Sequence, residues 1–359
     1  MLSAQIIKRK ALEYGADLVG IGDVRHFEGT SPQRDPRSIL PDASCVIGFG
    51  FRVPRALYRA MERKVQYFNY TQLGVKQIDE ELSEVFLLKM GALIENEGYD
   101  ACLQRNVSNL RIKGDHSTNP EVSDTYELEH AEAVAPGKTV PDVILDFADA
   151  ARICGLASVS CKGNAIAPKL GPFVRFVFLV TNAPLETDPP FAGSICDRCG
   201  KCAEACPGHA VDVRNGLDTW QCAVYYRGAH RSNPFMNADF LKDHPAREQI
   251  LNGDYHFTRE SARAIYPELN FLPMRATGYA PCLCGKLCDI ACYNHLKEKN
   301  CYEHAQTENH RPLPPLRRGS GPLRERRTLP RSESPSADAG SPDRDLRGIP
   351  PAPRRPARN

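Results

Sequence analysis

The sequence predicts a layered α/β (α+β) domain over residues 1–185, a cysteine-rich domain over residues 186–305 and a disordered segment over residues 310–359. Three observations predict this division. Apolar strands alternate with amphipathic helices in the first part, a pattern typical of layered folds. Ten of the 14 cysteines lie between residues 196 and 301. Residues 311–359 contain 12 arginines and 11 prolines but no aromatic residue, too little apolar surface to offset the entropy of folding.

The elements of residues 1–185 follow from the apolar pattern. Three strands are expected where apolar and β-branched residues run together: Leu18–Ile21, Ser44–Phe51 and Phe173–Thr181. Three helices are expected where the pattern is helical: residues 4–14, Val75–Asn96 and Asp142–Ile153. The continuous apolar run FVRFVFLVT predicts that the last strand is buried on both faces. Residues 107–140 are polar and rich in turns, and no element is assigned there.

Composition narrows the location and the chemistry. A net charge of +2 does not by itself indicate nucleic-acid or membrane binding. No segment approaches the roughly 20 apolar residues of a membrane span, and the N-terminus lacks the apolar core of a signal peptide. We therefore expect a cytoplasmic protein with no membrane partner, a monomer or a small homo-oligomer. Because disulfides are disfavoured in a reducing compartment, 14 cysteines indicate metal ligation.

The strongest motif is CDRCGKCAEACPG, whose four cysteines follow the pattern C-x2-C-x2-C-x3-C-P: Cys196, Cys199, Cys202 and Cys206. Three thiolates two residues apart can each bind one iron on a single face of a [4Fe–4S] cluster. The fourth, on the helix that follows, binds the other cluster of a pair. A zinc site, the alternative, normally uses two separated C-x2-C pairs. The motif thus predicts a ferredoxin-like domain that holds two [4Fe–4S] clusters.

A pair of clusters requires a second set of cysteines, and PCLCGKLCDIACYNHL supplies it: Cys282, Cys284, Cys288 and Cys292. Cys222, in WQCAVYYRG, lies between the two motifs, in front of a mostly helical insert over residues 223–281. Nine candidate thiolates therefore serve eight ligand positions, and one is spare. The remaining cysteines fall outside the pattern and are expected to be core or surface thiols: Cys45, Cys102, Cys154, Cys161 and Cys301.

With these motifs the sequence resembles the epoxyqueuosine reductases and their relatives, the corrinoid-dependent reductive dehalogenases. The resemblance covers most of residues 1–300. Cys222, sixteen residues after Cys206, stands where the family has a single cysteine. Upstream, ICGLASVSCKGNAIAPKLG is similar to the family's glycine-rich turn, with Gly155 and Lys162 among the matching positions.

The resemblance implies a ligand set for each cluster. Cluster 1 would take the first three cysteines of the first motif and the last cysteine of the second: Cys196, Cys199, Cys202 and Cys292. Cluster 2 would take the other four: Cys206, Cys222, Cys284 and Cys288. The family's last motif is usually C-x2-C-x3-CP, whereas this chain has three residues between Cys284 and Cys288 and no following proline. Cys282 can therefore replace Cys284, and the sequence leaves both open.

The resemblance also implies a nitroreductase-like α/β domain that binds cobalamin, and two site residues. Asp142 lies nearest the place of the family's catalytic aspartate, although the proline and glutamate of that motif are missing. Lys162 would bind the cofactor. Gly48-Phe49-Gly50 is a fragment of a dinucleotide fingerprint, but its third glycine is absent, so we set that interpretation aside.

The function that the resemblance implies is a reductive removal of oxygen or halide, by an oxidoreductase that passes electrons through its clusters to a corrinoid. A ferredoxin or flavodoxin would be the electron donor, and a modified tRNA nucleoside is one substrate it suggests. The alternative is a ferredoxin-type electron-transfer protein that reduces a partner's cofactor and has no substrate of its own. The incomplete aspartate motif favours this alternative, whereas the retained N-terminal domain favours the enzyme.

Overall fold

The computed structural model describes residues 2–105, 110–114, 126–269, 271 and 281–299. All of them belong to one compact unit. Cys301 and the predicted disordered segment, residues 310–359, lie outside the described residues, and the predicted boundary between residues 185 and 186 stays a prediction. None of the described helices combines the length and the apolar character needed to cross a membrane.

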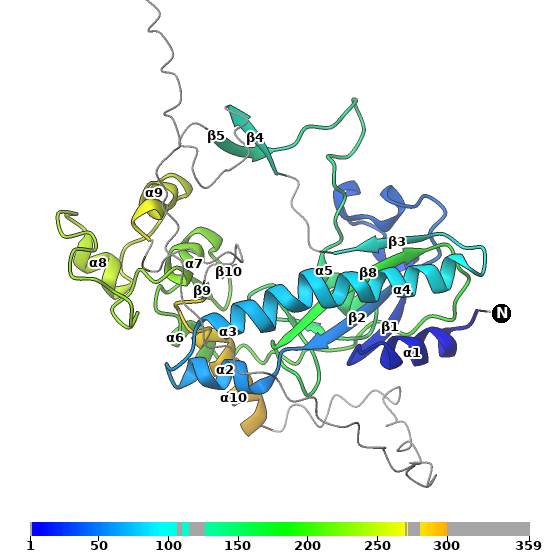
Figure 1. The fold of residues 1–359 in the computed structure, drawn as a ribbon, viewed down its shortest axis with the longest axis horizontal. Helices are drawn as coiled ribbons and strands as arrows, with labels where there is room; N and C mark the ends of the chain where they lie inside the picture. The colour runs from blue at the N-terminus through cyan, green and yellow to red at the C-terminus, as the bar shows by residue number, and fades with distance from the viewer. Residues whose placement is uncertain (1, 106–109, 115–125, 270, 272–280, 300–359) are drawn as a thin grey trace, which may run out of the picture. The chain divides into compact units, whose positions relative to one another are not determined.

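A four-stranded antiparallel sheet forms the centre of the N-terminal part (Figure 1). Its strands lie in the order β1 (Leu18–Asp23), β2 (Cys45–Arg52), β8 (Val174–Thr181) and β3 (Ala101–Gln104). The three strands predicted from the sequence are confirmed, and β3 was missed. β8 is a central strand, and all its residues except Arg175 are buried, as the continuous apolar run predicted.

One face of the sheet is covered by α1 (Ala4–Glu13) and α4 (Ser83–Glu95). Alternate residues of β2 point to this face, and the rings of Phe49 and Phe51 meet Phe86 of α4 at centroid distances of 4.8 and 5.1 Å. The helix predicted over Val75–Asn96 is present, but its first part is the π-helical segment η4 (Gln72–Leu82). Two short helices precede it, α2 (Arg55–Glu62) and α3 (Phe68–Thr71).

The opposite face is covered by α5 (Phe147–Ile153), which begins five residues later than predicted. The Asp146 carboxylate accepts hydrogen bonds from the amides of Ala148 and Asp149 and so caps the helix at that point. Glycines let α5 and its following turn approach the sheet: a Cβ at Gly20 would lie 2.0 Å from the Cys154 carbonyl oxygen, and one at Gly48 would lie 2.9 Å from Leu156. The glycine pattern of β2 is thus explained by close packing.

Shorter elements connect these layers. Three 3-10 turns follow β1: η1 (Val24–Phe27), η2 (Pro32–Arg34) and η3 (Pro36–Ser38). Two antiparallel strand pairs were not predicted: β4 (Leu110–Gly114) with β5 (Tyr126–His130), and β6 (Ser158–Val159) with β7 (Ala165–Ile166). The first pair lies in the polar region for which the sequence predicted no element.

The cysteine-rich region is built from short helices and one small hairpin: α6 (Lys201–Glu204), β9 (Val211–Asp212), β10 (Gly216–Leu217), α7 (Thr219–Tyr226) and α10 (Leu287–Glu298). The predicted insert contains α8 (Arg247–Asn252), α9 (Arg259–Ile265) and η5 (Tyr266–Glu268), with an apolar core of its own. α10 packs on the N-terminal layers. The ring of Phe173 stacks on that of Tyr58 of α2, and the same Phe173 ring lies 5.8 Å from that of Tyr293 on α10.

Candidate metal centre

The cysteines of the two motifs are held by turns and helix starts. Gly200, at φ +81°, begins α6 in a conformation that glycine adopts without strain, and Cys202 follows on that helix. Cys206 comes after α6, and its sulfur accepts a hydrogen bond from the Ala210 amide at 3.3 Å. Cys222 lies on α7. These positions bring thiols from distant parts of the sequence toward one another.

The first thiol group combines the loop before α6 with α10. Cys292 lies beside Cys196 and Cys202. Burial is the main cause that raises its pKa to about 12, opposed by Lys162 and reinforced by Asp289 and then by these two thiols. Cys199 is exposed and also lies near Cys202. The structure therefore gathers the four cysteines that the resemblance assigned to cluster 1. We define the first thiol group by these residues and one addition: Cys161, Cys196, Cys199, Cys202 and Cys292.

The addition, Cys161, was expected to lie outside the pattern. Its thiol lies against those of Cys196 and Cys202, and burial followed by these neighbours raises its pKa to about 12. It also packs against the apolar cluster that Cys202 and Cys206 form with Val211. This proximity could not be predicted from the sequence, because only the fold brings residue 161 to the first motif.

The second thiol group comprises Cys206, Cys222, Cys284 and Cys288, the set that the resemblance assigned to cluster 2. Burial, followed by the nearby thiols of Cys284 and Cys206, raises the pKa of Cys222 to about 11. Cys288 also interacts with Cys284, although burial is the main cause of its raised pKa. A chain of neighbouring thiols thus runs from Cys206 through Cys222 and Cys284 to Cys288.

Cys282 and Cys284 differ in their surroundings, although their sulfurs are only 3.6 Å apart. Cys282 is fully buried in the main apolar core, in the same cluster as Ile290 and Tyr70. Cys284 is partly buried and lies beside Cys222. Because Cys284 rather than Cys282 lies beside Cys222, the geometry favours Cys284 as the fourth member of the second group.

Helix α10 contributes to both groups. Cys288 and Cys292 are four residues apart and therefore lie on the same side of the helix, one turn from each other. Cys288 neighbours Cys284, whereas Cys292 neighbours Cys196 and Cys202. An all-thiol donor set in two groups fits two iron–sulfur clusters, because each cluster takes about four cysteine thiolates.

A buried ion network joins the second thiol group to the N-terminal layers. The Lys162 ammonium contacts the Asp289 carboxylate, and these side chains are only 7% and 9% exposed. Lys286 lies 3.3 Å from the other oxygen of the same carboxylate. Despite burial, which opposes ionisation, the two ammonium groups lower the pKa of Asp289 to about 2. Lys162, predicted to bind the cofactor, is therefore engaged by Asp289, a partner that the sequence did not suggest.

A cleft beside this network is lined by β8, which we call the β8 cleft, with a volume of about 600 Å³. Apolar side chains of β8 such as Val174 and Phe176 line one part, whereas Asn164, Lys286 and Asp289 add polar groups. Its size falls within the range of small-molecule sites. No histidine is among the residues that line it, so the described chain offers no imidazole ligand to a bound metal there.

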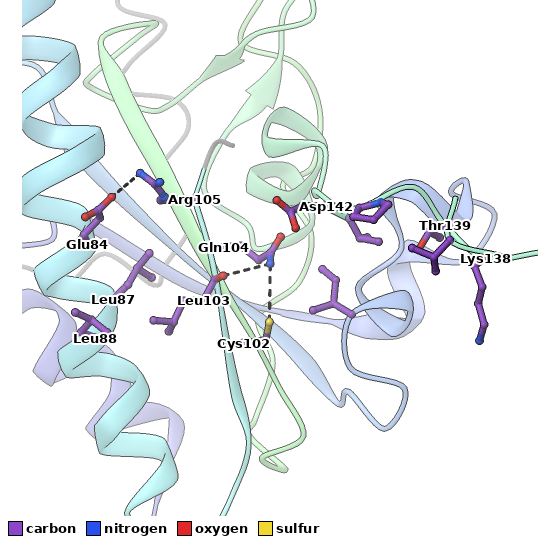
Figure 2. Close-up of a pocket in the computed structure, with 14 residues that line it drawn as sticks. Glu84, Leu87, Leu88, Cys102, Leu103, Gln104, Arg105, Lys138, Thr139 and Asp142 are labelled. Atoms are coloured by element: carbon purple, nitrogen blue, oxygen red, sulfur yellow. Dashed lines mark hydrogen bonds and ion pairs between the residues drawn. The ribbon is translucent and has the colours of Figure 1, made fainter. Parts of the chain in front are cut away.

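Asp142, the predicted catalytic residue, is exposed in the segment before α5 and lines the β8 cleft. It also lines a second cavity of about 810 Å³ beside β3, the β3 pocket, shown in Figure 2. The Arg105–Glu84 ion pair stands on one side of this pocket, and Leu87 and Leu88 contribute an apolar wall. Asp142 thus lies between two cavities, and no cysteine of either thiol group is among the residues that line them.

A polar network adjoins the first thiol group. Asp197 receives hydrogen bonds from His295 and Lys299, each at 2.8 Å. Although partial burial opposes it, these two bonds hold the pKa of Asp197 below its usual range. The ligand atoms of Asp197, Cys199 and His295 lie within 4.8 Å of one another, which is close enough for a single metal ion. The Lys299 ammonium already balances the carboxylate, so a cation there would have to displace it.

The other cysteines lie in or beside the sheet. Cys45 and Cys154 are buried in its two apolar clusters, and Cys102 is half-buried on β3. Burial raises the pKa of Cys45 to about 12. These three thiols are therefore neutral packing groups, as expected.

Comparison with known proteins gives partial matches. No family model matches the chain. An epoxyqueuosine reductase of Synechococcus sp. (strain CC9605) is 34% identical over 83 residues, which are 23% of this chain and 26% of that protein. A tetrachloroethene reductive dehalogenase of Sulfurospirillum multivorans is 40% identical over 60 residues, 16% of this chain and 12% of that protein. A solved epoxyqueuosine reductase from Streptococcus thermophilus aligns with a TM-score of 0.41 and 15% identity, over 76% of this chain and 68% of that chain.

These matches cover only part of each relative. The chain matches about a quarter of the length of the first relative and about an eighth of the second. The resemblance predicted from the cysteine motifs is confirmed: over these segments, the chain is similar to epoxyqueuosine reductases and to a reductive dehalogenase.

Proposed function

We propose that this chain is an iron–sulfur oxidoreductase that holds two [4Fe–4S] clusters and reduces a substrate bound at the β8 cleft. The observation that carries the proposal is the gathering of the motif cysteines into two thiol groups. Cys196, Cys199, Cys202 and Cys292 hold cluster 1. Cluster 2 is held by the second thiol group, in which the proximity of Cys284 to Cys222 favours it over the core residue Cys282.

The β8 cleft is the proposed cofactor and substrate site. Its apolar β8 wall suits the face of a corrinoid, and the Asn164 amide suits the amide groups at a corrinoid's edge. When bound, the clusters supply one-electron transfer, and the corrinoid supplies a low-valent metal centre for cleaving a carbon–oxygen or carbon–halogen bond. Lys286 and Asp289 lie both in the cleft lining and beside Cys288, so the cleft adjoins the second thiol group.

Asp142 is the proposed proton donor. Reduction of an epoxide to an alkene and water consumes two electrons and two protons, and an exposed carboxyl at the cleft can relay protons from solvent. The Gln33 amide donates hydrogen bonds to the backbone carbonyls of Val140 and Asp142 and so fixes the segment that carries it. A modified tRNA nucleoside and a halogenated compound are the two substrate classes that the similar proteins suggest.

The second candidate is an electron-transfer protein that takes electrons from a ferredoxin or flavodoxin and passes them to a partner's cofactor. One observation favours it: Asp142 lies outside any helix or strand and lacks the motif that accompanies the catalytic aspartate in the similar family. Binding of cobalamin by the isolated chain separates the two candidates, because an electron carrier has no need of it.

The test is anaerobic purification of the full chain, followed by iron analysis and by visible spectra with and without cobalamin. We expect about eight irons per chain and a shifted corrinoid band. Ala148→Phe, which places a ring in the β8 cleft, should abolish the shift and retain the iron, whereas Ala148→Ser should preserve both. Eight irons without a corrinoid shift would favour the electron carrier, and zinc in place of iron would refute both candidates.

A further inference from the structure

Five thiols, rather than four, surround the proposed site of cluster 1. Cys196, Cys199, Cys202 and Cys292 account for the four ligand positions that a [4Fe–4S] cluster offers. Cys161 is the fifth, with Cys196 and Cys202 as its neighbours. Its sequence context gives no ligand motif, since it lies 41 positions before Cys202 and 35 before Cys196.

The position of Cys161 is fixed by the β6–β7 hairpin. Within its turn, the Ser160 amide donates to the Asn164 carbonyl at 2.8 Å, and the Gly163 amide donates to the Ser160 carbonyl at 3.0 Å. Just before the turn, the Ser158 hydroxyl accepts a hydrogen bond from the Ile195 amide at 3.0 Å. Since Ile195 directly precedes Cys196, this bond ties the hairpin to the first motif and holds Cys161 against it.

The chemistry of Cys161 suits a ligand kept in reserve. Cys161 packs against the cluster that contains Cys202, so it lies close enough to bind an iron that loses its ligand, but it has no position to fill while four other thiolates hold the cluster. A thiol next to an iron that has lost its ligand loses its proton far more readily, because the metal stabilises the thiolate.

From this geometry we infer that Cys161 is a reserve ligand of cluster 1. When the thiolate of Cys196 is absent, Cys161 binds the iron that Cys196 otherwise holds. The inference rests on the proposed function, since it requires a cluster in the first thiol group. In the exchange the Cys161 thiol gives its proton to solvent, a sulfur–iron bond forms in place of the missing one, and no electron is transferred. Cys292, on α10, is the contrasting position, because the thiols that interact with Cys161 are those of Cys196 and Cys202.

The test compares iron content and reduced-state electron paramagnetic resonance spectra of the anaerobically reconstituted full chain and four variants. We expect about eight irons in the wild type, in Cys161→Val and in Cys196→Ala, with an altered cluster 1 signal in Cys196→Ala. The double variant Cys196→Ala/Cys161→Val and the control Cys292→Ala should each retain about four. Valine preserves the packing of Cys161, and the unchanged cluster 2 signal reports that each variant is folded.

The other outcomes overturn the inference. A loss of four irons in Cys196→Ala alone would show that Cys161 cannot take the vacant position. Eight irons in the double variant would show that another group fills it, and a loss in Cys161→Val would make Cys161 an obligatory ligand. In each of these cases a wild type with eight irons leaves the proposed function standing. A wild type with four irons or none would instead contradict the proposed function itself.

Discussion

The two thiol groups differ in what surrounds them. The first includes the exposed Cys199 and adjoins the surface network of Asp197 and Lys299. The second has no exposed thiol, and beside it lie the buried Lys162–Asp289 pair and the β8 cleft. An electron donor that docks from solvent would meet the first group, and a ligand in the cleft would meet the second. Under the proposed function, this arrangement would suit electron transfer from the surface to the cleft.

The two groups also differ in the elements and contacts that hold their cysteines in place. The first group shares α10 through Cys292 but otherwise depends on the loop before α6 and on α6 itself, and that loop is held by the Ser158–Ile195 hydrogen bond and by the Asp197–His295 contact. The second depends on helices, α7 and α10, and on an ion pair to the N-terminal layers. Changes in the second group should therefore affect the stability of the whole unit, and changes in the first should affect mainly its own cluster.

The largest expected effect is the loss of one cluster. Cys222→Ser should lower the iron content from about eight to about four and remove the cluster 2 signal only, because each cluster takes four thiolates. Cys292→Ser, the matched change on α10, should remove the cluster 1 signal instead. Iron analysis and electron paramagnetic resonance of the reduced proteins measure both. If Cys222→Ser left both clusters intact, Cys282 and Cys284 would both have to be ligands.

The features of the site and of the fold that depend on local spacing could be predicted from the sequence. The first motif specifies its chemistry within eleven residues, and the strands at Leu18, Ser44 and Phe173 follow from continuous apolar runs. The α5 start was misjudged because Asp146 is a cap, and its local hydrogen bonds decide where the helix begins. β3 escaped notice because it has only four residues, too few for a clear alternation.

The features that depend on contacts between distant residues could not be predicted. Asp289 reads as a surface residue of a cysteine motif, and only the fold brings Lys162 to it across 127 positions. The same holds for Cys161, which the hairpin carries to the first motif. The resemblance supplied the grouping of the motif cysteines, but it could not supply a fifth thiol or an ion pair.

The next largest effect tests the ion pair that distinguishes the second group. Asp289→Asn leaves the buried Lys162 ammonium without its carboxylate, which should cost about 3–5 kcal/mol in the free energy of unfolding. Glu13→Gln removes an exposed surface pair with Lys10 and should lower stability far less, because solvent screens the pair. Anaerobic thermal denaturation of the loaded proteins compares them. Equal midpoints for the two variants would show that the pair does not secure the second group.

A smaller effect concerns pH and His230, whose Nδ1 lies 2.9 Å from the Ser232 hydroxyl. Burial lowers the pKa of His230 to about 4, below the value of about 6.5 in an unfolded chain. Between these values the unfolded state binds the proton and the folded state does not, so stability falls as the pH falls. From pH 7 to pH 5 the loss is about 2 kcal/mol.

The matched variant for this prediction is His230→Gln, which removes the titrating group. Its denaturation midpoint should fall less between pH 7 and pH 5 than that of the wild type, whatever its midpoint at pH 7. An identical fall in both proteins would show that other groups, including the cluster ligands, carry the acid sensitivity.

The smallest effect on iron content is expected for the cysteines of the sheet, which belong to neither thiol group. Cys45 and Cys102 lie on β2 and β3 of the sheet, whereas the motif cysteines Cys202, Cys222, Cys288 and Cys292 lie on helices of the cysteine-rich region. Cys102→Ser exchanges a half-buried thiol for a hydroxyl of similar size, so it should leave the iron content at about eight and change stability by less than about 1 kcal/mol. Cys45→Ser buries a hydroxyl in the core and should cost more stability, about 1–3 kcal/mol, with the same iron content. Iron analysis after anaerobic reconstitution decides the point, because lower stability with full iron identifies a packing thiol. Iron loss in either variant would extend a thiol group into the sheet and contradict the division on which the comparison rests.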